Sequence, residues 1–155
     1  MPKSAPYTPD ALTEAHLMAW ARMVRATTHV LQVVEEALKG AGLPTLSWYD
    51  LLLELRRAGP EGMRPVRLQK EMLIPQYNMS RLLDRVEEAG YVQRLACDND
   101  GRGQIVKITP SGEDLLRQMW PIYRHALSTS FASAVDEATA KEMSMALSTF
   151  GSRQG

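Results

Sequence analysis

Residues 90–110 read GYVQRLACDNDGRGQIVKITP, and this stretch decides the fold. Two short β-rich segments, 91–95 and 104–108, flank a centre of Asp, Asn and Gly residues that tolerate a left-handed backbone. We therefore predict a β-hairpin with a charged loop. Thr109 and Pro110 are typical of a helix start, so a helix should follow the hairpin directly. A helix, a hairpin and another helix in this order indicate a winged helix-turn-helix, a mainly α fold with a small β-hairpin wing (α+β).

The segment before the hairpin predicts two helices around a tight turn, which is the helix-turn-helix arrangement. The first helix is expected over 66–72, residues 73–75 form the turn, and the second helix is expected over 76–89. Further upstream, Ser47 and Asp50 have the spacing of a capping box. This box would open a helix that ends at the Ala-Gly-Pro sequence of residues 58–60.

One face of the second helix should be buried, and the other carries side chains that can bind DNA. Four apolar residues recur at helical spacing: Met79, Leu82, Leu83 and Val86. Gln and Asn side chains can pair with adenine and Arg with guanine, so the polar face is equipped to read a major groove. An ordinary solvated polar face is the alternative. The residues predicted to contact DNA here and in the wing are Gln76, Tyr77, Asn78, Ser80, Arg81, Arg85, Arg102 and Lys107.

Three further charged residues, Arg94, Asp98 and Asp100, should shape the wing around Arg102. Arg102 is flanked by glycines at the loop tip and can reach into a narrow minor groove, although a salt bridge inside the wing is the alternative. Asp98 and Asp100 would repel phosphates if they pointed outward. We expect these two carboxylates to cap the turn or to pair with Arg94 or Arg102.

Charge and length agree with one DNA-binding domain. The 155-residue chain has no net charge, with 18 Lys and Arg against 18 Asp and Glu. Residues 62–108 carry eight basic and six acidic residues, whereas the counts are six and seven before them and four and five after them. A small basic excess in the middle predicts salt-dependent affinity for nucleic acid. The length predicts a single domain over 1–155.

The sequence also bears on location. No apolar run approaches the length of a membrane span, and the first residues lack the apolar core of a signal peptide. Cys97 is the single cysteine and cannot form an intramolecular disulfide, which fits a reducing compartment. We expect a cytoplasmic protein that has no membrane partner.

The N-terminal part predicts one long amphipathic helix. Thr8, Pro9 and Asp10 are typical of a helix start, and no breaker follows before Gly40. Apolar residues recur at three- and four-residue steps along the whole segment. A helix of this length needs more partner surface than a small domain offers.

The C-terminal part also predicts helices that need partner surface. Thr109 should cap a helix that continues to about residue 131. Pro121, inside this helix, is expected to kink it or break it into two. Asp136 should cap another helix that runs to Phe150. We interpret 8–43 and 110–150 as a homodimerisation part and 46–109 as the winged DNA-binding part, with two-fold symmetry as the default. A monomer with a long exposed helix is the alternative.

The sequence resembles the MarR family of bacterial transcription regulators. The match runs through residues 46–52, 78–94, 98–102 and 108–112, and the wing pattern that ends in Thr-Pro-x-Gly is its specific part. The resemblance implies a triangular homodimer that binds a palindromic operator and usually represses transcription. It also implies that a small ligand or an oxidant relieves binding.

The resemblance assigns roles to single residues. It implies that Arg102 is the wing arginine and that Asp100 is the acid that holds its surroundings. Pro75 departs from the pattern, because many relatives have a serine where this helix begins, and a side-chain cap with its phosphate contact is lost. The groove-reading segment implied by the resemblance comprises Gln76, Tyr77, Asn78, Ser80 and Arg81.

The sequence offers fewer candidates for effector binding than for DNA contact. In the family, effectors often bind between the winged part and the dimerisation part, and such a pocket would suit a small aromatic or anionic effector. Ordinary core packing is the alternative for the residues concerned. An oxidant sensor at Cys97 is a further alternative. The possible pocket comprises His16, Trp20, Trp48, Tyr49 and Arg56.

Other functional classes have less support. The three histidines are far apart in sequence, so we expect no metal site, and no cofactor is predicted. An enzyme is not expected, because neither a nucleophile with its base nor a phosphate-binding loop is present. A winged-helix protein-interaction module without specific DNA binding is the remaining alternative. We predict a sequence-specific transcription regulator whose partners are double-stranded DNA, a second copy of the chain and a small effector.

Overall fold

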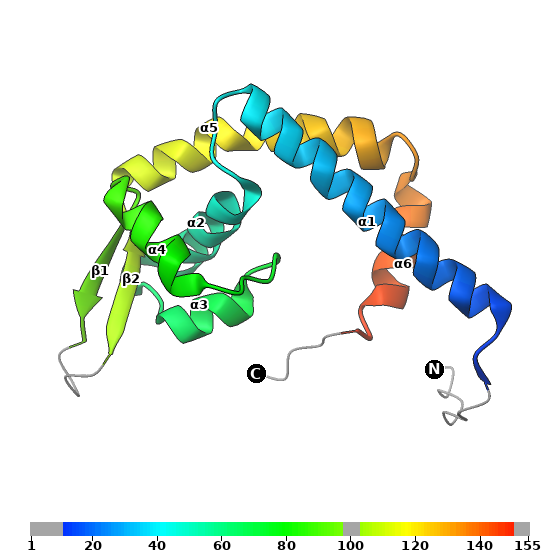
Figure 1. Cartoon of the computed structure of the whole chain (residues 1–155), viewed down its shortest axis with the longest axis horizontal. Helices are drawn as coiled ribbons and strands as arrows, with labels where there is room; N and C mark the ends of the chain where they lie inside the picture. The colour runs from blue at the N-terminus through cyan, green and yellow to red at the C-terminus, as the bar shows by residue number, and fades with distance from the viewer. Residues whose placement is uncertain (1–10, 98–102, 151–155) are drawn as a thin grey trace.

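The computed structural model describes residues 11–97 and 103–150. Figure 1 shows α5 running along the top of the molecule, with the winged part below its start and with α1 and α6 near its far end. None of the described helices is long and apolar enough to cross a bilayer. The elements, in chain order, are α1 (Glu14–Gly40), α2 (Leu46–Ala58), the 3₁₀ turn η2 (Gly59–Glu61), α3 (Pro65–Glu71), α4 (Met79–Glu88), β1 (Val92–Ala96), β2 (Gln104–Ile108), α5 (Pro110–Leu127), the π-helical turn η3 (Ser128–Ala132) and α6 (Glu137–Leu147).

The long first helix begins later than the sequence predicts. Thr13 and His16 form a reciprocal cap: the Thr13 backbone N–H donates to His16 Nδ1 at 3.2 Å, and the His16 N–H donates to Thr13 Oγ1 at 3.4 Å. The predicted start at Thr8 lies outside the described residues. Within them, α1 begins at Glu14, because the cap at Thr13 satisfies free backbone N–H groups of its first turn. The helix then continues to Gly40, as expected.

The helix after the hairpin crosses its proline without a break. Thr109 caps it as predicted, since the Gly112 N–H donates to Thr109 Oγ1 at 3.1 Å. Pro121 lies inside α5, so the alternative of two separate helices is wrong. A single proline removes one backbone donor, and α5 packs against both α1 and α2. Asp136 caps α6, also as predicted, and α6 ends at Leu147 instead of Phe150.

The start of α2 is held by long-range contacts. The predicted capping box of Ser47 and Asp50 is wrong, because the helix begins at Leu46 and neither side chain caps it. Instead, the Leu46 N–H donates to Glu35 Oε1 of α1 at 3.0 Å. Leu51, Leu52 and Leu55 of α2 lie in the core with no measurable exposure. Helix α2 therefore joins α1, α5 and the wing around one core.

The wing is the predicted antiparallel hairpin. Its register pairs Val92 with Ile108 at the base and Ala96 with Gln104 towards the loop. The outer edge of β2 is also paired, because Met63 exchanges two backbone hydrogen bonds with Val106, each 2.9 Å long. The hairpin is thus extended by a strand fragment that precedes α3.

Candidate nucleic-acid interface

Helix α4 begins at Met79, and the residues expected in its first turn precede it. Asn78 is the N-cap, and its Oδ1 accepts a hydrogen bond from the Arg81 N–H at 3.0 Å. The predicted helix 76–89 is therefore too long at its start, and Pro75 does not occupy the first helical position. An Asn side chain at this point competes well for the cap because it satisfies a free backbone donor.

The predicted reading residues divide into two groups. Gln76 and Asn78 are engaged within the turn, since Gln76 Nε2 donates to the Ile74 carbonyl at 3.3 Å and Asn78 caps the helix. Tyr77 is fully exposed, and Ser80 and Arg81 also lie on the surface. The four residues of the predicted apolar stripe are all buried: Met79, Leu82, Leu83 and Val86.

A buried carboxylate holds the turn before α4. Asp50 of α2 is only 5% exposed, and its Oδ2 accepts a hydrogen bond from the Ile74 N–H at 2.7 Å. Ile74 lies in the turn between α3 and α4, two residues before Gln76. Asp50 therefore connects α2 to the segment that presents Tyr77, a role that a local sequence pattern does not reveal.

Arg94 ties the wing to α4. Its guanidinium Nη2 lies 2.7 Å from Asp84 Oδ1 and 2.9 Å from Glu87 Oε1. The Arg94 backbone N–H also donates to Glu87 Oε2 at 2.7 Å. Hydrogen bonds from the Arg94 side chain and backbone lower the pKa of Glu87, and bonds to Glu87 and then Asp84 raise the pKa of Arg94.

The remaining wing predictions have mixed outcomes. Asp98, Asp100 and Arg102 lie outside the described residues, and the partners of Arg94 come from α4. Lys107 is half-buried on β2, where it pairs with Gln93 in the register. Of the wing residues predicted to contact DNA, Lys107 is the one that the structure describes.

A basic group formed by α3 and its N-cap residue Arg64 was absent from the residues predicted to contact DNA. Arg64, Arg67 and Lys70 are exposed around an open hollow of about 750 Å³, whose other wall is formed by the wing at Gly103 and Gln104. Arg64 Nη2 also donates weakly to Cys97 Sγ at 3.8 Å. The basic excess in the middle of the sequence was the available signal, but it did not single out this helix.

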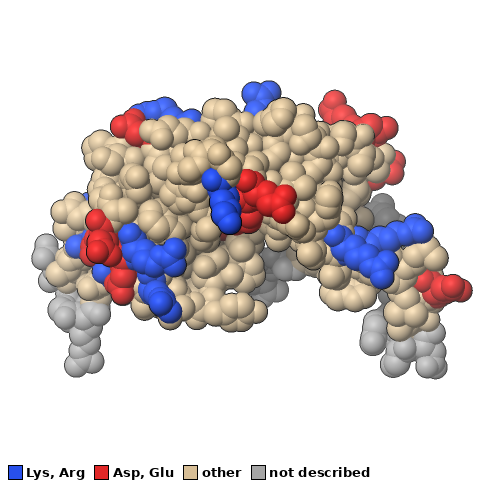
Figure 2. Space-filling model, turned by 45° about the horizontal axis from the view of Figure 1, so that its top comes forward, with Lys and Arg blue, Asp and Glu red and all other residues tan. Residues whose placement is uncertain are grey.

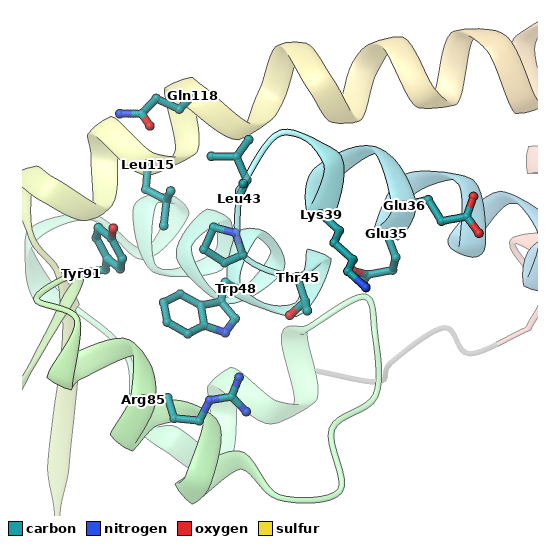
Figure 3. A pocket seen from close by; sticks show the side chains of 12 residues that line it. Glu35, Glu36, Lys39, Leu43, Thr45, Trp48, Arg85, Tyr91, Leu115 and Gln118 are labelled. Carbon is teal, nitrogen blue, oxygen red and sulfur yellow. The ribbon is translucent and has the colours of Figure 1, made fainter.

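Arg85 lies one helical turn beyond Arg81, on the same side of α4. It lines a second open hollow, of about 630 Å³, together with Lys39, Trp48 and Tyr91 (Figure 3). This hollow lies where the end of α1 and the start of α2 meet α4 and α5. The Trp48 and Tyr91 rings are in edge-to-face contact, with centroids 6.0 Å apart.

The structure does not bring the five predicted pocket residues together within one chain. Trp48 lines the hollow just described, whereas His16 caps the far end of α1 and Trp20 is 63% exposed on that helix. Tyr49 packs against aromatic rings of α5, with centroid distances of 6.3 Å to Trp120 and 5.2 Å to Tyr123. Burial raises the pKa of Tyr49, with smaller opposing effects from Arg56 and Arg57.

The helices at the two ends of the chain expose apolar side chains. No residue of α6 is buried. On the face seen in Figure 2, most of the surface is uncharged and the charged side chains gather in a few clusters. The large exposed apolar residues of α1, α5, η3, α6 and the adjoining segments are Leu12, Leu17, Met18, Trp20, Val24, Trp120, Phe131, Met143, Met145, Leu147 and Phe150.

Known proteins share both this sequence pattern and this fold. The family model described as MarR family matches residues 41–103, from the end of α1 to the wing. An uncharacterized HTH-type transcriptional regulator of Bacillus cereus is 28% identical over 124 residues, which cover 80% of each protein.

Two solved structures show the same fold over most of the chain. Sco3205, a MarR family transcriptional regulator from Streptomyces coelicolor solved in complex with DNA, is 24% identical, has a TM-score of 0.80, and is aligned over 90% of this chain and 88% of that chain. BpsR from Bordetella bronchiseptica is 19% identical, has a TM-score of 0.73, and is aligned over 85% of this chain and 97% of that chain. With its winged helix-turn-helix between two sets of flanking helices, the chain has the fold of MarR family transcriptional regulators, and the MarR family model matches its winged part.

Proposed function

We propose that this chain binds duplex DNA with the start of α4 in the major groove and the wing in the adjacent minor groove. The exposed surface at the start of α4 is the observation that carries the proposal. Tyr77, Ser80 and Arg81 project there, while the apolar residues of the same helix are buried in the core. Arginine and hydroxyl side chains contact base edges and phosphates in such positions. Sco3205, which has the same fold, is bound to DNA in its crystals.

The basic group on α3 fits the DNA backbone. Arg64, Arg67 and Lys70 lie beside the wing, and the first helix of a helix-turn-helix crosses the sugar-phosphate backbone. Contacts from these side chains would add affinity without sequence preference and would steepen the salt dependence. Arg81 is the described residue that we assign to guanine recognition.

We assign the exposed apolar surface of α1 and α6 to a second copy of the chain. Trp20 is 63% exposed and Met145 is 74% exposed, and both belong to a large set of exposed apolar side chains on these helices. A stable monomer rarely presents so much apolar surface. A two-fold dimer would bury these side chains and would place two α4 helices on one side of the assembly. DNA with inverted half-sites about one helical turn apart would suit this arrangement. Repression is the expected result of occupying such a site.

The hollow beside Arg85 is our candidate effector site. It combines two aromatic rings, of Trp48 and Tyr91, with the cations of Arg85 and Lys39 and the carboxylates of Glu35 and Glu36. Glu35 already accepts the Leu46 N–H and Glu36 accepts from Gln32, so we assign the two cations to a small aromatic acid. Arg85 belongs to α4, so an occupant would act directly on the helix that we assign to the major groove. DNA binding by BpsR is regulated by such a molecule, 6-hydroxynicotinic acid.

Selection from random duplexes at two salt concentrations tests the proposed function. The purified chain should enrich a two-fold symmetric sequence, and the enrichment should weaken steeply as salt is raised. Enrichment of a single half-site would contradict the dimer. An absence of any enrichment, with α4 otherwise intact, would favour the protein-interaction module and remove the basis for assigning Arg81 to a guanine.

A further inference from the structure

The outer edge of the wing is attached to α4 by one group of charged side chains. We call Arg94 of β1, together with Asp84 and Glu87 of α4, the wing–helix cluster. Both oxygens of Glu87 are used: Oε2 accepts the Arg94 backbone N–H at 2.7 Å, and Oε1 accepts from Nε at 3.1 Å and from Nη2 at 2.9 Å. The same Nη2 lies 2.7 Å from Asp84 Oδ1.

These contacts replace a missing strand neighbour. The wing has two long strands, and the outer edge of β2 is paired with Met63. On the outer edge of β1, the Glu87 carboxylate takes the N–H that another strand would otherwise take. An α4 side chain thus completes the backbone hydrogen bonding of the wing, so the two elements cannot move apart without losing charge-assisted hydrogen bonds.

Apolar packing does not perform this task near the loop. Val92 at the base of β1 is 3% exposed, whereas Leu95 is 37% exposed and Ala96 lies on the surface. Arg94 is on the same side of the strand as Val92 and is the next residue towards the loop on that side. The planar guanidinium accepts few orientations relative to a carboxylate, so it fixes direction as well as distance.

We infer that the wing–helix cluster is a positioning device that sets the placement of the wing relative to α4, so that both can enter their grooves at once. The inference rests on the proposed function, in which α4 and the wing occupy different grooves. Arg94 itself is directed at α4 and is a positioning residue instead of a DNA contact. Figure 2 shows basic and acidic side chains lying side by side at the end of the molecule where Figure 1 places α4 and the wing.

Glu87→Gln separates positioning from simple electrostatics. Removing an acid near DNA makes the protein more positive and, by charge alone, should strengthen binding to phosphates. Loss of the carboxylate that receives the Arg94 fork should instead loosen the wing and weaken binding. The two explanations therefore predict changes of opposite sign. Glu88→Gln, the neighbouring residue on α4, removes the same charge and supplies the matched control.

Dimethyl sulfate footprinting on the selected site reads both grooves in one experiment, because guanine N7 lies in the major groove and adenine N3 in the minor groove. For the full-length Glu87→Gln protein we expect minor-groove protection by the wing to fall about tenfold relative to Glu88→Gln, while major-groove protection under α4 remains. Arg94→Met, which keeps length but not the fork, should give the same pattern.

Three results would overturn the inference. The first is unchanged minor-groove protection in both Glu87→Gln and Arg94→Met, and the second is equal loss in both grooves. The third is a gain in affinity for Glu87→Gln that matches that of Glu88→Gln, which would show that charge alone matters. Failure of the wild-type chain to protect either groove would count against the proposed function and not against the cluster. Thermal unfolding of each variant identifies any loss that comes from misfolding.

Discussion

Asp50 offers the sharpest test of how the turn before α4 is held. Asp50→Ala removes the acceptor for the Ile74 N–H, which the buried carboxylate now holds at 2.7 Å. An unsatisfied amide in a largely buried place costs about 1–3 kcal/mol. Part of this cost is offset because the variant no longer buries a charge, so we expect a loss of about 1–2 kcal/mol in the free energy of unfolding. Asp50→Asn keeps an acceptor oxygen and should lose less than about 1 kcal/mol.

The assay combines three measurements on the same samples. Urea unfolding gives the stability at one fixed protein concentration, since the dimer that we propose would make stability depend on concentration. Amide exchange at Ile74 should become faster in Asp50→Ala. Affinity for the selected duplex should fall, because the turn presents Tyr77. Asp114→Ala is the matched control, since Asp114 forms an exposed pair with Arg117 on α5 and should cost under about 0.5 kcal/mol.

Two results would refute this role of Asp50. If the Ile74 amide of Asp50→Ala exchanges as slowly as in the wild type, the carboxylate does not hold the turn. Equal loss of DNA affinity in Asp50→Ala and Asp114→Ala would show that the effect is not specific to the turn.

Four further outcomes are expected. The pKa of Glu87 is lowered in the folded chain, so its contribution to stability is present above its unfolded pKa and is lost as pH falls through the folded value. Denaturant unfolding between about pH 3 and 7 should therefore show that the wild type is more stable than Glu87→Gln at neutral pH and loses this difference at the acid end. Gly112→Ala should destabilise the chain by about 1–3 kcal/mol in urea unfolding, because an added Cβ would overlap the Tyr91 carbonyl oxygen. Trp20→Glu should shift the chain from dimer to monomer in analytical ultracentrifugation, because it places a charge on the exposed apolar face of α1. Arg81→Ala should cost about 1–3 kcal/mol in affinity and relax the base preference at one position of each half-site, measured by binding to single-base variants of the site.

Each of these outcomes can be contradicted. A constant difference between wild type and Glu87→Gln over the whole pH range would remove the linkage argument. Wild-type stability in Gly112→Ala would show that the α5–wing contact adapts. A Trp20→Glu protein that stays dimeric would move the interface elsewhere, and an unchanged base preference in Arg81→Ala would leave that residue in a phosphate-binding role.

Local sequence patterns predicted the elements whose causes are local. The Asp-Asn-Gly centre and the β-rich flanks predicted the hairpin, and Thr109 and Asp136 predicted two caps that the structure contains. The apolar stripe of α4 was also predicted correctly, because its spacing follows from the helical repeat alone. These features need no knowledge of which distant segments meet.

The errors arose where a distant partner decides the outcome. Ser47 and Asp50 match a capping box, but the acceptor for the start of α2 is Glu35 and the partner of Asp50 is Ile74, 24 residues further along the chain. The helix after Pro75 was expected to start at Gln76, yet the cap that Asn78 forms places the start of α4 at Met79.

The residues around the candidate pocket also depend on which distant segments pack together. Trp48, predicted for the pocket, and Arg85, predicted as a DNA contact, line the same hollow. Which side of α4 faces the end of α1 depends on tertiary packing, and no periodicity in α4 records it. His16 and Trp20 were grouped with Trp48 by residue type, although the length of α1 separates them.

The unbroken course of α5 restricts how such a protein can change over evolution. Inserting one residue into an α-helix turns everything beyond it by about 100° and advances it by about 1.5 Å. Because α5 connects the wing, through Thr109, to η3 and α6, one insertion between Pro110 and Leu127 would turn the wing relative to those helices. Insertions in residues 128–136 would leave the wing where it is. Length variation among descendants of this chain should therefore collect after Leu127, while the length of α5 is inherited unchanged.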